Sequence, residues 1–148
     1  MVIKLMPSDI TERWEAIAVG IDQSLPPYVY REPKVFESIL HRLMLDDMQC
    51  WALTKDSESD IQAIATTLVT SDGIADIKTL LIYSLYAYLP TSGELWKEGI
   101  ESLKKYAKHR GCSALSAYSI NTRVEQIAKL TGGESNNYLM WRTLDENI

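Results

Sequence analysis

The sequence predicts a single α/β domain with a mixed, mostly antiparallel central sheet flanked by helices. The chain has 148 residues, which is enough for one hydrophobic core and too few for two. The spacing of apolar residues is helical up to about residue 47 and alternates with a period of two afterwards. A long helical pattern then lies between later strands, which is typical of layered α/β folds. We therefore expect residues 1–148 to form one domain.

The first third of the chain is predicted to contain a short strand and two helices. Apolar residues recur three and four positions apart in two separate runs, the spacing of helices that bury one face. A proline pair ends the first run and an aspartate pair ends the second. The expected elements are a strand over residues 2–6, a helix between the stop and cap at residues 7–9 and Pro26-Pro27, and a helix from Pro33 to Asp46-Asp47.

The middle of the chain is predicted to supply three neighbouring strands of the sheet. Its turn signals are a polar run and a Ser-Asp-Gly triplet, whose glycine can adopt a positive φ. The third strand is the longest apolar stretch and is expected to be central and buried on both faces. The expected elements are strands over residues 49–54, 61–70 and 76–89, with turns at residues 55–60 and 71–73.

The last third is predicted to alternate helices and strands. Residues 90–93 break the central strand, and the basic residues near Arg110 favour the C-terminal end of a helix, with Gly111 after its last turn. The expected elements are a helix over residues 94–110, a strand over 112–119, a helix over 121–130 and a strand over 138–144.

Composition and charge exclude several classes of function. The net charge is −5, which disfavours nucleic acids and anionic membranes as partners because both need a concentrated positive face. Cys50 and Cys112 lie in strand-like segments without metal-ligand spacing, so we expect reduced thiols and no metal site. No apolar run approaches the length of a signal peptide or membrane span, and we expect a cytoplasmic protein.

Three segments of the second half carry a family resemblance. They are Leu80-Leu81-Ile82-Tyr83, the helix end that leads into Gly111-Cys112, and Asn121-x-Arg123-x-x-x-Ile127-Ala128-Lys129-Leu130-x-Gly132. Together with the order of elements, they resemble the GNAT family, the Gcn5-related N-acetyltransferases. The resemblance implies a GNAT-like sheet whose strands diverge after the fourth. The run Leu-Leu-Ile-Tyr-Ser-Leu-Tyr before a Trp-containing helix is also similar to small GNAT-like proteins of tailed bacteriophages.

The resemblance implies a degenerate acetyl-CoA site between the central strand and the long helix. In the GNAT family this loop reads Arg/Gln-x-x-Gly-x-Gly/Ala, and its backbone N–H groups hold the CoA phosphates. Glu94 and Trp96 fall at the two glycine positions, where a carboxylate repels phosphate and an indole takes the space that phosphates need. An alternative loop built on Thr91, Ser92 and Gly93 remains open.

The sequence identifies no catalytic residue. In the GNAT family a tyrosine of the last helix often reprotonates the leaving thiolate, but the matching position here is Ala128. A carboxylate base would have to be Asp72 or Asp76, and both lie where turn formation is the competing explanation. Three tyrosines of the central strand either line a cleft or pack in the core: Tyr83, Tyr86 and Tyr88.

Three functions therefore remain open. The first is a non-catalytic interaction or structural protein, such as a phage virion or assembly component in the host cytoplasm or virion, with no cofactor and with a protein partner or a second copy of itself. The second is an N-acetyltransferase that uses acetyl-CoA and acts on an amine mainly by positioning. The third is a small-molecule binding module that uses the same cleft.

The best candidate for a contact surface is the loop Pro26-Pro27-Tyr28-Val29-Tyr30-Arg31. Two prolines make it rigid, and tyrosine and arginine are enriched at interfaces. Tyr28, Tyr30 and Arg31 are therefore predicted interface residues, with Trp96 as a fourth. In the GNAT family this region lies over the acceptor substrate, so the enzyme hypothesis makes the loop a substrate lid. Packing of both tyrosines on the sheet is the remaining alternative.

Overall fold

The computed structural model describes residues 1–56, 60–118, 122–135 and 139–142. Within them the chain forms one five-stranded sheet, in the order β1-β2-β3-β4-β5. The strands are β1 (Val2–Lys4), β2 (Gln49–Thr54), β3 (Ile61–Asp72), β4 (Ile77–Ala87) and β5 (Ala114–Ala117). The helices are α1 (Pro7–Glu12), α2 (Trp14–Gln23), α3 (Pro33–Met44), α4 (Gly93–His109) and α5 (Thr122–Leu130).

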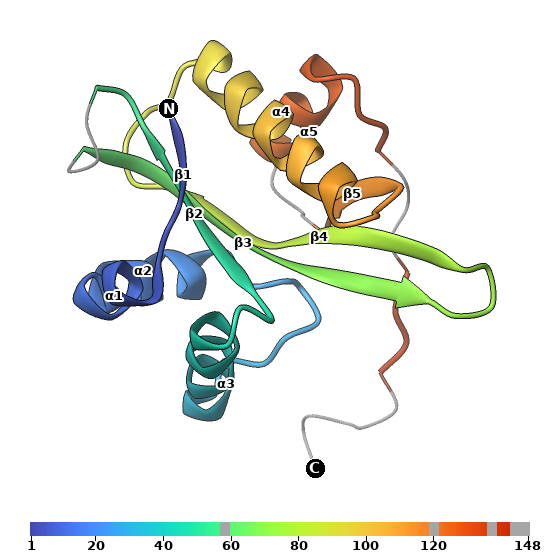
Figure 1. The fold of residues 1–148 in the computed structure, drawn as a ribbon, viewed down its shortest axis with the longest axis horizontal. Helices are drawn as coiled ribbons and strands as arrows, with labels where there is room; N and C mark the ends of the chain where they lie inside the picture. The colour runs from blue at the N-terminus through green and yellow to red at the C-terminus, as the bar shows by residue number, and fades with distance from the viewer. Residues whose placement is uncertain (57–59, 119–121, 136–138, 143–148) are drawn as a thin grey trace.

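The sheet lies between two layers of helices. Helices α1, α2 and α3 lie on one face, and α4 and α5 lie on the other (Figure 1). Strands β1 to β4 pair antiparallel, and β5 pairs parallel to β4. The predicted class, an α/β fold with a mixed, mostly antiparallel sheet, is confirmed.

The element boundaries differ from the prediction in several places. The first predicted helix is split into two helices, α1 and α2, because Arg13 between them departs from helical geometry at φ −106° and ψ 15°. β3 extends two residues beyond its predicted end, to Asp72, whose carboxylate accepts hydrogen bonds from the N–H groups of Ile74 and Ala75 in the turn. β4 begins one residue later and ends two residues earlier than predicted. The strand predicted over residues 138–144 does not form over residues 139–142, and its other residues lie outside the described part of the chain.

The two faces of the sheet bury separate clusters of apolar side chains. On the face of α2 and α3 the buried residues include Ile17, Ile21, Leu43 and Ile64, and on the other face Leu103 of α4 packs against the sheet. Cys50 lies within the first cluster, and burial raises the pKa of its thiol to about 12. This thiol is therefore a neutral core side chain at physiological pH.

A buried polar chain fixes the register of β2 and β3. The Thr67 hydroxyl accepts a hydrogen bond from Trp51 Nε1 at 2.9 Å and donates one to Gln49 Oε1 at 2.9 Å. Gln49 in turn donates to the carbonyl of Asp46. Thr67 and Gln49 are buried, so the chain satisfies polar groups that water cannot reach.

We expect Thr67→Val to lower the free energy of unfolding by about 2–4 kcal/mol, because it removes the partner of two polar groups without changing the side-chain shape. Urea unfolding measures the change. Thr70→Val is the matched control: Thr70 is exposed on the same strand and makes one hydrogen bond, to the carbonyl of Thr79. Equal losses in the two variants would contradict a special role for the buried chain.

Candidate functional site

A β-bulge in β4 is the local feature that shapes the candidate site. On β3 and β4, Thr66 lies opposite Ser84 and Thr67 lies opposite Ile82, so Tyr83 has no partner across the ladder. The Thr66 and Ser84 hydroxyls share a hydrogen bond of 2.6 Å that holds one side of the bulge. An extra residue in one strand bends it and rotates the side chains that follow.

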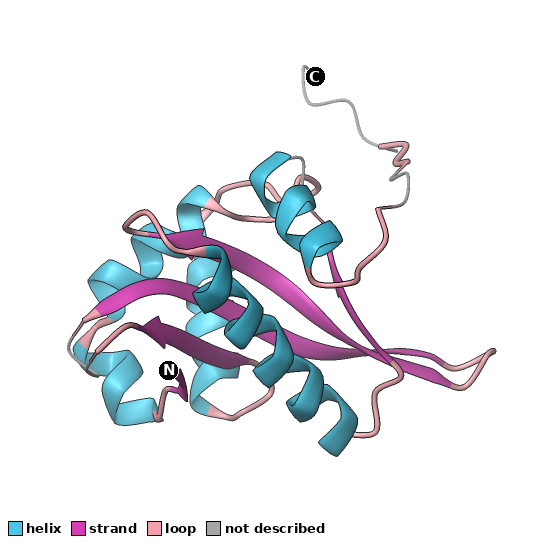
Figure 2. Ribbon diagram, turned by 90° about the horizontal axis from the view of Figure 1, so that it is seen from above, coloured by secondary structure: helices cyan, strands magenta, loops and turns pink. Residues whose placement is uncertain are grey.

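The pairing of β4 with β5 ends immediately before this bulge. It extends only from Thr79 and Ala114 to Ile82 and Ala117, although β4 continues to Ala87. β5 ends there at Ala117, and the longer β4 extends past it (Figure 2). The divergence of the strands after the fourth stays a prediction, because residues 119–121 lie outside the described part of the chain.

A cavity of about 510 Å³ lies beside the part of β4 that extends past the end of β5. Its walls come from β4, the end of β5, the first turn of α4, helix α5, and the segment that follows α2. The prediction that β4 is buried holds for Leu80 to Ile82 and for Ser84, whereas Ile77 and Lys78 are exposed and Tyr83 and residues 85–87 are half-buried. The lining residues are Gln23, Ser24, Leu25, Pro27, Arg31, Ile82, Tyr83, Ser84, Leu85, Tyr86, Ala87, Trp96, Ala117, Tyr118, Val124 and Ile127.

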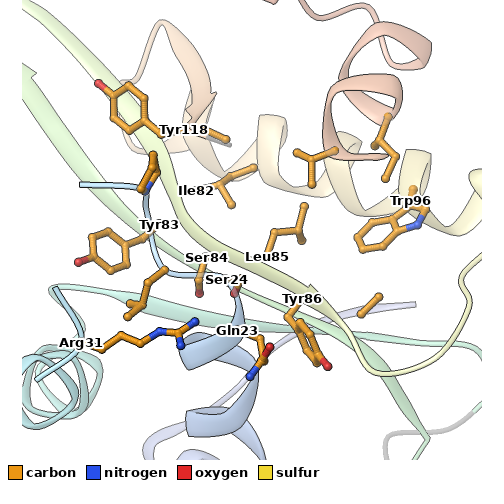
Figure 3. Close-up of a pocket in the computed structure, with 16 residues that line it drawn as sticks. Gln23, Ser24, Arg31, Ile82, Tyr83, Ser84, Leu85, Tyr86, Trp96 and Tyr118 are labelled. Atoms are coloured by element: carbon orange, nitrogen blue, oxygen red, sulfur yellow. The ribbon is translucent and has the colours of Figure 1, made fainter. Parts of the chain in front are cut away.

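The cavity has an apolar side and a polar side, because the bulge changes the direction of the β4 side chains. Ile82 and Leu85 point toward α4, whereas Tyr83, Ser84 and Tyr86 point to the other face of the sheet (Figure 3). Consecutive residues of a regular strand point to opposite faces, so Tyr83 and Ser84 share a face only because of the bulge.

The three tyrosines of the predicted central strand have different positions. Tyr83 and Tyr86 line the cavity while also packing against the core, and burial raises the pKa of the Tyr83 phenol. Tyr88 donates a hydrogen bond to the Ala16 carbonyl at 2.6 Å, and burial above all raises its pKa to about 12. Tyr88 therefore has a structural role and anchors α2 to the sheet, whereas Tyr83 and Tyr86 both pack in the core and line the cavity.

Trp96 points inward rather than into the loop before α4. Its side chain is 7% exposed and packs with Leu53, Ala63 and Ile127. One edge of the indole lines the cavity on its apolar side (Figure 3). Trp96 therefore lies on the inner face of the first turn of α4, and its effect on a phosphate site stays a prediction.

The predicted phosphate-loop residues surround the N-terminus of α4. Thr91 is buried and donates a hydrogen bond to the Leu89 carbonyl. Ser92 is the N-cap and accepts a hydrogen bond from the N–H of Leu95 at 3.2 Å. Gly93 is the first helical residue, and Glu94 beside it is exposed. The N–H groups of Gly93 and Glu94 are thus the ones that a helix start presents to a ligand.

The predicted interface loop lies at the rim of the cavity. Tyr28 is half-buried and packs edge-to-face on Tyr118 at 5.7 Å, while Tyr30 is 45% exposed with the Arg142 guanidinium 4.4 Å from its ring centre. Arg31 lines the cavity and is held by Asp22, whose carboxylate is 3.4 Å from Arg31 Nε. The structure thus brings Arg31 and Trp96 to one cavity, on opposite sides of β4.

The other residues weighed from the sequence lie away from this cavity. Asp72 and Asp76 belong to the turn of the β3–β4 hairpin, where Asp76 has a φ of 55°. Turn formation therefore explains both carboxylates. Among the described residues no group of three or more metal-binding side chains occurs, and no described helix has the length and apolar character to span a bilayer.

Sequence reasoning did not single out the polar wall made by Gln23, Ser24 and Ser84. Ser84 faces the cavity only because of the bulge, and a bulge leaves no clear pattern in one sequence. Gln23 and Ser24 mark the end of α2, which comes before the proline pair that was expected to end this helix.

We expect Trp96→Ala to lower the free energy of unfolding by about 3–5 kcal/mol, because it leaves a hole among packed side chains. Trp141→Ala is a control of the same type, since Trp141 is 80% exposed, and should change stability by less than about 0.5 kcal/mol. Thermal and urea unfolding measure both variants. A Trp96→Ala protein as stable as the wild type would show that the indole does not support the core.

Comparison with known proteins places the fold among acetyltransferases. No family model matches the chain, and no curated protein matches its sequence. A GNAT family acetyltransferase from Staphylococcus aureus is 16% identical with a TM-score of 0.67, over 97% of this chain and 98% of that one. AAC(6')-Iy, solved with the bisubstrate analog CoA-S-monomethyl-acetylneamine, is 12% identical with a TM-score of 0.72, over 98% and 97%. Glucosamine-6-phosphate N-acetyltransferase from Arabidopsis thaliana is 15% identical with a TM-score of 0.67, over 98% of each chain. The chain therefore has the GNAT fold over nearly its whole length.

Proposed function

We propose that the protein is an N-acyltransferase that transfers an acyl group, acetyl in the simplest case, from a CoA thioester to an amine in the cavity beside β4. The observation that carries this proposal is the cavity itself, which opens where β5 stops pairing with β4. It lies within a fold that the chain shares, end to end, with acetyltransferases.

The exposed edge of β4 suits the cofactor. CoA carries two amide groups between its phosphates and its sulfur, so an extended CoA arm can hydrogen-bond to a strand edge as an added strand does. The β4 residues from Tyr83 to Ala87 have no partner on β5 and border the cavity. The apolar side, with Leu85 and Trp96, suits the methylene groups of such an arm.

The start of α4 suits the phosphate end of CoA only in part. The first N–H groups of a helix attract anions, and the inward position of Trp96 leaves the outer side of this turn without an indole. The Glu94 carboxylate opposes a phosphate there, and Ser92 already caps one N–H group. We therefore expect the acyl arm to supply most of the affinity.

The chemistry needs positioning more than acid–base groups. The amine nitrogen attacks the thioester carbonyl carbon, an N–C bond forms, and the C–S bond breaks with its electron pair on sulfur. The nitrogen loses a proton to solvent and the thiolate gains one. Effective molarity from a shared cavity lowers the barrier without a dedicated base. Tyr83, Tyr86 and Tyr118 are the phenols that border the cavity and can donate a proton to the thiolate.

The second candidate is a contact protein that kept the fold and lost the cofactor. Glu94 at the helix start and Ala128 at the position of the family's usual acid favour it. A phage virion or assembly role is a narrower form of this candidate and stays a prediction from sequence. A binding module for another small ligand would use the same cavity.

Calorimetric titration separates these candidates. We expect acetyl-CoA to bind at micromolar to low millimolar strength, and S-acetyl-N-acetylcysteamine, a thioester that lacks the phosphates, to bind measurably as well. Mass spectrometry of an amine mixture incubated with acetyl-CoA then detects transfer. Absence of binding by both thioesters would rule out the acyltransferase proposal and favour the contact protein.

We expect Glu94→Gln to tighten acetyl-CoA binding by about two- to fivefold, because it removes a negative charge beside the phosphates. The affinity for S-acetyl-N-acetylcysteamine should not change. Glu101→Gln, on the same helix in an exposed ion pair with Lys104, is the control. If Glu94→Gln leaves the affinity for acetyl-CoA unchanged, the phosphates do not lie at the start of α4.

A further inference from the structure

The charge of the cavity wall identifies what the acceptor must carry. Among the described lining residues Arg31 is the one charged side chain, and none of them is acidic. The chain as a whole has a net charge of −5, so a cavity whose only charge is positive differs from the rest of the molecule. A polycationic acceptor would meet no carboxylate in this wall, whereas an anionic group would meet a guanidinium.

The Arg31 side chain is held in place from behind. One Nη donates a hydrogen bond to the Asp22 carbonyl at 3.0 Å, and Nε lies 3.4 Å from the Asp22 carboxylate. A guanidinium has five N–H donors in a rigid fork, so these contacts leave further donors for a ligand. The side chain extends along the polar side of the cavity toward Ser84 and Gln23 (Figure 3).

The neighbouring groups on this side of the cavity are polar. Gln23 brings an amide, and Ser84 brings a hydroxyl group that shares a hydrogen bond with Thr66. The Ser24 hydroxyl donates to the Gly20 carbonyl at 2.7 Å, so its proton is already used. A second guanidinium lies next to the cavity: Arg142 donates a hydrogen bond to the carbonyl of Pro27, which is itself a lining residue. An amide N–H group beside a guanidinium suits the oxygen atoms of a carboxylate or phosphate.

We propose that the acceptor is a small primary amine that also carries a carboxylate or phosphate group, and that Arg31 binds this anionic group. This inference rests on the proposed acyl transfer. Asp22 acts as a positioning residue for Arg31. Trp96 and the start of α4 lie on the other side of β4, so the acceptor and the CoA arm approach the β4 edge from opposite sides.

Two matched pairs of probes test the proposal. Ethanolamine and phosphoethanolamine differ by a phosphate, and β-alaninamide and β-alanine differ by a carboxylate. We expect the anionic member of at least one pair to bind about tenfold or more tightly than its partner, as seen by calorimetry or NMR titration. The pair with the larger difference identifies the anionic group. Spermidine, a polyamine without an anionic group, should bind no better than ethanolamine.

Substitution of Arg31 then tests whether its guanidinium causes the tighter binding of the anionic probe. Arg31→Gln should abolish the difference within the pair, and Arg31→Lys, which keeps the charge without the fork, should retain part of it. Arg110→Gln is the control, because Arg110 bonds to Tyr106 at the far end of α4. Melting temperatures check folding, and Arg31→Lys serves as the test variant if Arg31→Gln does not fold.

The outcomes separate this inference from the proposed function. If acetyl-CoA binds but neither anionic probe is preferred, or if spermidine binds best, the Arg31 inference is wrong and the acyltransferase proposal stands. If the anionic probes bind through Arg31 but no thioester binds, the acyltransferase proposal fails and the anion site stands. A loss of acetyl-CoA affinity in Arg31→Gln without any change for the amines would assign Arg31 to the cofactor and overturn the inference.

Discussion

The candidate site depends on the extra residue, Tyr83, in β4. Parallel pairing with β5 continues for as long as β4 is regular and ends at Ile82, the last residue before the bulge. β5 itself ends at Ala117, so the edge of β4 beyond Ile82 has no partner on β5 and lies beside the cavity. The bulge turns Tyr83 and Ser84 to the same face, which gives the cavity its polar side. One inserted residue thus gives the cavity its chemical asymmetry.

The order of elements could be predicted from the sequence because each element carries its own periodic pattern. The strand over residues 49–54 matches β2 at both ends, and Gly111 has the positive φ of 76° that was expected after the long helix. The break at Arg13 was missed, because both flanking helices bury the same kind of apolar stripe. The strand predicted over residues 138–144 rested on composition alone, and strand propensity depends on a partner strand.

The candidate site was predicted less well than the fold, because it depends on side-chain direction. Counting along the chain placed Trp96 in a phosphate loop, but a helix that starts at Gly93 turns its fourth residue toward the sheet. The same indole then supports the core and borders the cavity. Arg31 was singled out as a contact residue, and its place in the cavity wall depends on how Asp22 holds it, which no spacing rule contains.

The start of α4 and the Arg31 side of the cavity place opposite electrostatic demands on a ligand. At the start of α4 the helix attracts anions, whereas Glu94 repels them, and the two effects are of similar size at an exposed site. Near the end of α2, Arg31 lies in a cavity wall whose other described lining residues are uncharged, and the Asp22 carboxylate that pairs with Arg31 is the negative charge that a bound carboxylate or phosphate would face. If both proposals hold, selectivity for charge resides mainly on the Arg31 side of β4. The proposed thioester arm, bound mostly through its amides and methylene groups along the β4 edge, is compatible with a weak phosphate site, because it needs no contact with Glu94.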